Sequence, residues 1–98
     1  MIDKLTKPTI HMNGTDGEDL LDGYIQALTV VLSAIGQVQK TGPHGRDYYI
    51  QDAGAINRAI QEHSCRLQRL DAVREELDAI AADLLDQQAQ RKAAKEGK

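Results

Sequence analysis

The chain has 98 residues, of which 41% are hydrophobic, and it contains neither Trp nor Phe. Its formal net charge is −3, which argues against a protein whose main task is to grip a nucleic-acid backbone, because such domains are usually basic. A single domain of this composition must build its core from Leu, Ile, Val and Ala, so the core is thin. We therefore expect a homo-oligomer.

The cysteine count and the apolar segments bear on the compartment. Cys65 is the only cysteine, so no intramolecular disulfide can form and a reducing compartment is expected. The first fourteen residues lack an apolar stretch of signal-peptide length, and the run ALTVVLSAIG is too short to span a bilayer. These observations predict a soluble, cytoplasmic protein with no membrane partner.

The first half of the chain predicts an extended arm followed by a helix. Residues 1–14 show no helical spacing of apolar residues and contain a proline and a glycine, so we expect an arm there. Thr15 and Glu18 have the spacing of a capping box and mark a helix start. Apolar residues at three- and four-residue steps then predict a helix over about 16–40, which Gly42 ends.

A longer second helix is predicted over about 52–90, followed by a charged, frayed tail over 91–98. Its apolar residues follow a coiled-coil-like spacing up to Leu70, and the next heptad position holds Arg74, so a slip of the seam is expected here. At ~1.5 Å per residue this helix outruns the first by roughly 20 Å. We expect its C-terminal half to be covered by another subunit, through Val73, Leu77, Ile80 and Leu84.

These elements together predict an all-α fold: an antiparallel helical hairpin over 15–90 with an extended N-terminal arm over 1–14. The longer second helix would provide coiled-coil-like oligomerisation. The subunit count is left open.

The connection KTGPHGRDYYIQD, residues 40–52, holds two of the three tyrosines. Glycines on either side of His44 allow left-handed backbone, Arg46 offers a planar set of donors, and tyrosines offer stacking faces. Two interpretations remain open: the loop is a lid on the open end of the hairpin, or it is a binding surface. The candidate binding residues are His44, Arg46, Asp47, Tyr48 and Tyr49, together with His11 and Asn13 of the arm.

The histidines do not predict a metal site. Neither His11 nor His44 has a second ligand at helical or turn spacing, and Cys65 is two residues from His63, on a different face of the helix. His63 occupies a seam position, where a hydrogen-bonded polar core residue is expected.

Charged residues on the second helix suggest ion pairs and a possible anion groove. Four-residue spacing predicts pairs of Arg58 with Glu62 and of Arg74 with Asp78. Arg66 and Arg69 could form a groove for an anion if they converge across a subunit interface. The sequence contains none of the common nucleophile, phosphate-binding, zinc or dinucleotide motifs, so we expect no enzyme and no cofactor.

Several short motifs carry a resemblance. PTIHMNGT, GRDYY and EHSCRLQRL resemble segments of short, uncharacterised helical-hairpin proteins encoded by bacterial viruses and prophages, over about residues 8–82. Ile50 departs from the proline expected before Gln51, so the entry into the second helix is in doubt. The resemblance carries over these positions without assigned roles: Ile10, His11, Asn13, Arg46, Asp47, Tyr48, Tyr49, Glu62 and His63.

The resemblance implies a small, non-catalytic viral accessory protein that acts by binding. The leading expectation is an oligomeric inhibitor of a host defence protein in the host cytoplasm, contacted through the arm and the GRDYY loop. One alternative is an oligomer that sequesters a small anionic nucleotide signal, with Arg46 on the phosphate. The other is a structural or assembly component of a virion.

Overall fold

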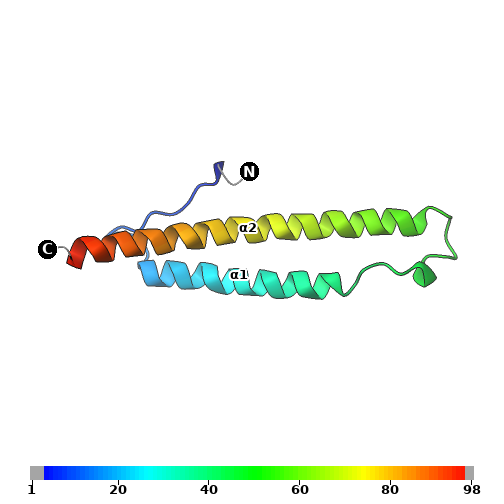
Figure 1. Ribbon diagram of the computed structural model, residues 1–98, viewed down its shortest axis with the longest axis horizontal. Coiled ribbons are helices and arrows are strands. Elements are labelled where there is room, and N and C mark those ends of the chain that lie inside the picture. Colours follow the sequence, from blue (N-terminus) through cyan, green and yellow to red (C-terminus); the bar gives the residue numbers. More distant parts are fainter. Residues whose placement is uncertain (1–3, 97–98) are drawn as a thin grey trace.

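Two antiparallel helices form an elongated molecule in the computed structural model, which describes residues 4–96 and measures 71 × 23 × 21 Å (Figure 1). Helix α1 spans Gly17–Gln39, a short 3₁₀ turn η2 spans Gly45–Asp47, and helix α2 spans Ala55–Glu96. The predicted all-α hairpin is confirmed. Helix α2 begins later than expected and continues through most of the segment predicted to be a frayed tail.

Helix α1 begins one residue later than the capping-box pattern predicts. Its N-cap is Asp16, whose Oδ2 accepts a hydrogen bond from the Glu18 backbone N–H at 3.1 Å, so the assignment of Thr15 as the cap is wrong. At the other end, the Thr41 hydroxyl donates to the Val38 carbonyl at 2.7 Å. No glycine in residues 4–96 has a positive φ, so the glycines beside His44 do not use left-handed backbone.

The seam of α2 runs without the expected slip. Residues at four- and three-residue steps from His63 to Gln88 are all buried or half-buried, and Arg74 is among them. Val73, expected to replace Arg74 at the contact, is 43% exposed. The apolar stem of Arg74 can cover the partner helix while its charged end stays in the solvent.

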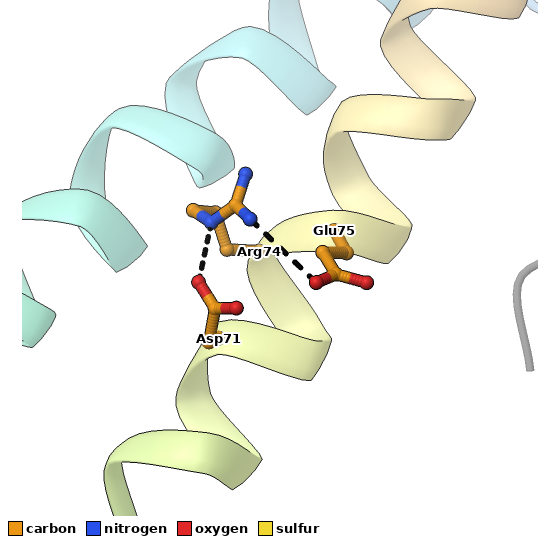
Figure 2. Close-up of polar contacts among 3 residues, drawn as sticks. All are labelled: Asp71, Arg74 and Glu75. Carbon is orange, nitrogen blue, oxygen red and sulfur yellow. Dashed lines mark hydrogen bonds and ion pairs between the residues drawn. The ribbon is translucent and has the colours of Figure 1, made fainter.

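Two carboxylates hold the charged end of Arg74 (Figure 2). Its Nε donates to Asp71 Oδ1 at 2.7 Å, and its terminal nitrogen Nη2 lies 3.8 Å from Glu75 Oε1. The hydrogen bond from Arg74 holds the pKa of Asp71 below its ordinary value. An arginine therefore occupies a seam position because neighbouring turns of the same helix supply its counter-charges.

Helix α2 extends beyond α1 at both ends (Figure 1). A Cβ on Gly17, at the start of α1, would lie 3.2 Å from Gln88 Nε2, so α1 starts level with Gln88, and α2 continues past this point to Glu96. After α1 ends, a Cβ on Gly42 would lie 3.7 Å from the half-buried His63 ring. Residues before His63 therefore extend beyond α1, where only the connecting segment runs (Figure 1).

This register contradicts the premise behind the predicted oligomer interface. Ile80 is 7% exposed and Leu84 is fully buried within one chain, and Leu77 is half-buried on the α2 seam. Their cover comes from α1 and the N-terminal arm, because α1 runs alongside the middle of α2, between about His63 and Gln88. The buried core cluster consists of Ile10, Leu21, Ile80, Ala81 and Leu84.

Two side chains of α2, Gln87 and Arg91, hold the arm. Gln87 Oε1 accepts a hydrogen bond from the Ile10 backbone N–H at 2.7 Å, and its Nε2 donates to the Pro8 carbonyl at 2.9 Å. Arg91 donates to the Ile10 carbonyl at 3.3 Å. The amide of Gln87 thus pairs with an extended segment as a neighbouring strand would, and it fixes Ile10 in the core cluster.

Helix α1 is, by length and composition, able to cross a membrane. The expectation that the apolar run is too short considered ALTVVLSAIG alone, whereas the helix that contains it has 23 residues. The core helix of a soluble protein passes the same test, so the cytoplasmic location stays a prediction.

Candidate functional site

The hairpin tip is a hydrogen-bonded turn rather than an open loop. His44 caps η2: its Nδ1 accepts from the Arg46 backbone N–H at 3.2 Å, and its carbonyl accepts from the Asp47 N–H at 3.0 Å. The Tyr48 N–H donates to the Gly45 carbonyl at 3.0 Å. These three bonds within five residues fix where the following side chains point.

The side chains of Arg46 and His44 lie together. A guanidinium nitrogen of Arg46 is 3.5 Å from His44 Nε2. Because Nδ1 of the same ring already accepts a backbone hydrogen bond, the neutral ring carries its proton on Nε2. With its proton on Nε2, the ring cannot accept from Arg46 at that nitrogen, so the two side chains are neighbours and not a hydrogen-bonded pair.

The two adjacent tyrosines have different environments. Tyr48 is half-buried, whereas Tyr49 is 78% exposed and the next residue, Ile50, is 83% exposed. Ala55 and Ala59, in the first turns of α2, are buried although α1 does not reach them, so the connecting segment covers them. Half-buried Tyr48 therefore suits the interpretation of the loop as a lid, and exposed Tyr49 suits its interpretation as a binding surface.

An ion pair closes the base of the tip. Asp52 Oδ1 accepts from an Arg58 guanidinium nitrogen at 2.8 Å, in place of the expected pair between Arg58 and Glu62. The Arg58 backbone N–H donates to the Gly54 carbonyl at 3.1 Å. Both side chains of the pair are more than half exposed, so the pair adds little stability and mainly orients the entry into α2.

The arm residues His11 and Asn13 lie at the opposite end of the hairpin from the tip. His11 belongs to a turn in which its carbonyl accepts from the Gly14 N–H at 3.1 Å, just before α1. The 23 residues of α1 separate this turn from the tip by roughly 35 Å. Within a single chain, the arm and the GRDYY loop therefore do not form one continuous surface.

Arg66 and Arg69 are exposed and line one shallow hollow on the surface of α2, with Arg58, Gln61, Glu62 and Cys65. The spacing places these residues on one side of the helix. Glu62 lies between two of the arginines and lowers the net charge of the hollow. Arg46 is not among the lining residues, so the complete set expected for a nucleotide is not assembled within one chain.

Metal binding finds no support in the described part of the chain. Over residues 4–96, no group of three or more His, Cys, Asp and Glu side chains comes close enough to hold an ion. Cys65 is exposed and free.

Comparison with protein families, with curated proteins and with solved structures finds no match.

Proposed function

We propose that this protein is a non-catalytic binding module whose contact surface is the hairpin tip, with Tyr49, Ile50 and Arg46 as the contacting residues. The observation that carries the proposal is the exposure of two adjacent large apolar side chains, Tyr49 at 78% and Ile50 at 83%. They follow a turn whose backbone is fixed by hydrogen bonds. A surface that is already ordered loses less conformational entropy when a partner binds.

The chemistry of the tip favours a protein partner over a small ligand. Tyr and Arg are enriched among the residues that contribute most to protein interfaces, because each combines a large contact area with hydrogen-bonding groups. Arg46, Tyr49 and Ile50 all have exposed side chains, and none of them lines the hollow that Arg66 and Arg69 share. A partner that fits would present an apolar depression for Tyr49 and Ile50 and a carboxylate for Arg46.

The resemblance to phage-encoded helical hairpins suggests a host protein, such as a defence factor, as that partner. This part of the proposal rests on the resemblance alone. Inhibition would follow from occupation of the partner's own binding surface by the tip.

A photo-crosslinking experiment tests the proposal. The full chain carries a benzophenone side chain at position 49, or at position 12 as control, because Met12 is 92% exposed at the other end of the molecule. A host protein that crosslinks from position 49 and not from position 12 is the expected result. The identified partner is then titrated with purified variants.

Substitution of Tyr49 by Ala should weaken binding to that partner by at least tenfold, since a central tyrosine contributes about 2 kcal/mol or more at an interface. Met12→Ala, the matched control, should leave binding unchanged, and both variants should keep the helical content of the parent protein. Binding that survives both Tyr49→Ala and Ile50→Ala, or crosslinks confined to position 12, would overturn the assignment of the tip.

A second candidate function has one observation in its favour: the hollow that Arg66 and Arg69 share. An arginine-lined surface is suited to phosphate groups. A nucleotide-sequestering oligomer predicts saturable, salt-sensitive binding of small anionic nucleotides that Arg66→Gln and Arg69→Gln abolish. Calorimetric titration with cyclic mononucleotides and dinucleotides tests this alternative, and absence of heat across that panel removes it.

A further inference from the structure

Helix α1 has more apolar surface than one partner helix can cover. One row, Leu21, Leu28 and Ile35, repeats every seven residues, and each member is buried or half-buried. A second row lies beside it, with steps of four, three and four residues: Ile25, Thr29, Leu32 and Gly36. Ile25 and Leu32 are 42% and 51% exposed in this second row, and open space surrounds Gly36.

The outer surface of α1 also lacks charge. Between Asp22 and Lys40 the helix contains no charged residue, although most of its side chains face outward. A solvent-facing helix surface normally carries charged residues opposite its apolar stripe. The pattern is that of a helix with neighbours on two sides.

The accessible surface of the chain exceeds that of a compact monomer by an area that a second subunit could bury. The accessible surface is 7463 Å², whereas a compact monomer of 10.8 kDa exposes roughly 5,500 Å². The difference of about 1,900 Å² exceeds the ~800 Å² that each partner buries in a standard interface and is in the range of obligate dimers. The radius of gyration, 20.0 Å, also exceeds the ~13 Å expected for a compact domain of this length.

We propose that a second copy of this chain docks on the row Ile25, Thr29, Leu32 and Gly36, with the two α1 helices antiparallel and crossing near Thr29. This alignment places Ile25 of one copy beside Leu32 of the other, and the small residues Thr29 and Gly36 allow the helices to approach closely. The result is a four-helix assembly with the α1 helices at its centre. It does not depend on the function of the tip.

Charge complementarity selects the antiparallel arrangement. The first turns of α1 carry Glu18, Asp19 and Asp22, and Lys40 follows its last residue. With Thr29 at the centre, Glu18 of one copy comes level with Lys40 of the other. A parallel arrangement would instead bring the acidic ends together, where like charges repel.

A lipid bilayer is the other surface that an uncharged helix of this length could enter. The structure favours a second copy. Helix α1 is packed along α2, and α2 has charged residues over its whole length. The first turns of α1 are themselves acidic. Insertion of α1 would require it to leave Leu84 and the rest of the core cluster uncovered.

Sedimentation analysis of the full chain with matched variants tests the interface. Leu32→Lys should shift the dimer to monomer, raising the dissociation constant at least a hundredfold. Val30→Lys is the control: Val30 is 67% exposed on the same helix, and its two-residue offset from Leu32 directs it to a different face. Ile25→Gln, a milder change, should weaken the dimer as well, with circular dichroism confirming unchanged helical content.

Cysteine crosslinking in a Cys65→Ser chain tests the direction. Thr29→Cys should form an intermolecular disulfide on oxidation, whereas Gly36→Cys should not, since antiparallel packing separates the two copies of residue 36 by roughly 20 Å along the axis. Disulfides at both positions would indicate parallel packing and overturn the alignment. Three results would overturn the interface. They are a monomeric parent chain, a dimer that Leu32→Lys does not weaken, and flotation of the protein with anionic phospholipid vesicles that Leu32→Lys abolishes.

Discussion

The contact between Gln87 and the arm supports a quantitative prediction. Substitution of Gln87 by Ala removes two hydrogen bonds to arm backbone, one from Ile10 N–H and one to the Pro8 carbonyl. Each such bond has a net value of about 0.5–1.5 kcal/mol, so the free energy of unfolding should fall by about 1–3 kcal/mol. Gln90→Ala, an exposed glutamine three residues further along α2, should change it by much less.

A double-mutant cycle separates the arm from the rest of Gln87's contacts. In a chain shortened to begin at Met12, Gln87 keeps only its bond to Asp83 at 2.8 Å, one turn away on α2. Such a pair within a helix contributes about 0.2–0.5 kcal/mol. Gln87→Ala should therefore cost little in the shortened chain, with a coupling energy of about 1 kcal/mol or more between the side chain and the arm.

Denaturant unfolding at one fixed protein concentration measures the cycle, and hydrogen exchange reports on the arm directly. The Ile10 amide should lose at least tenfold protection in Gln87→Ala, while amides in the middle of α1 stay protected. Equal destabilisation by Gln87→Ala in the full and shortened chains would refute the reasoning, because the residue would then act within α2 alone.

Two further predictions concern helix α1 and the α2 seam. Asp16→Ala should lower the free energy of unfolding by about 1 kcal/mol and Thr15→Ala by much less, and thermal unfolding of the pair shows which residue is the N-cap. The pKa of the Asp71 carboxyl should lie below its ordinary value of 3.8 and return toward it in Arg74→Gln, as followed by NMR titration. Because the folded-state pKa is lowered, the pair stabilises the fold above about pH 3.8 and loses this effect as pH falls through the lower folded value. An unchanged Asp71 titration in Arg74→Gln would contradict the pairing.

The heptad pattern was sufficient to predict two antiparallel helices, because apolar spacing reports directly on which side of a helix is buried. It failed at Arg74. An arginine at a seam position was interpreted as a slip, although the counter-charges Asp71 and Glu75 lie three residues before it and one residue after it. Side-chain pairing can satisfy a charge at the edge of a core, and apolar periodicity alone does not register this.

The register of the hairpin was the second feature beyond the sequence pattern. Helix lengths predict how far one helix projects in total, but not how that length is divided between its two ends. The division follows from the connecting segment, which extends along α2 instead of reversing tightly, and from the arm that covers Ile80. Gln87 lies in a segment without large apolar residues. Only the fold shows that its side-chain amide hydrogen-bonds to the backbone of the arm.

In the loop, composition drew attention to residues 44–49 but could not divide their roles. The difference in exposure between Tyr48 and Tyr49 depends on the turn that precedes them, where His44 Nδ1 accepts a hydrogen bond from the Arg46 backbone N–H. Whether the exposed part of the loop binds a partner stays a prediction.

The positions of the arm and of the C-terminal end of α2 have a practical consequence. Both lie on the half of the molecule away from the tip, with residues 45–50 at the far end of a body 71 Å long (Figure 1). A surface, resin or fluorescent domain attached beyond either of them would therefore lie far from the tip, and Tyr49 and Ile50 would stay accessible to a partner in solution. Immobilised binding assays can use either attachment without masking the surface under test.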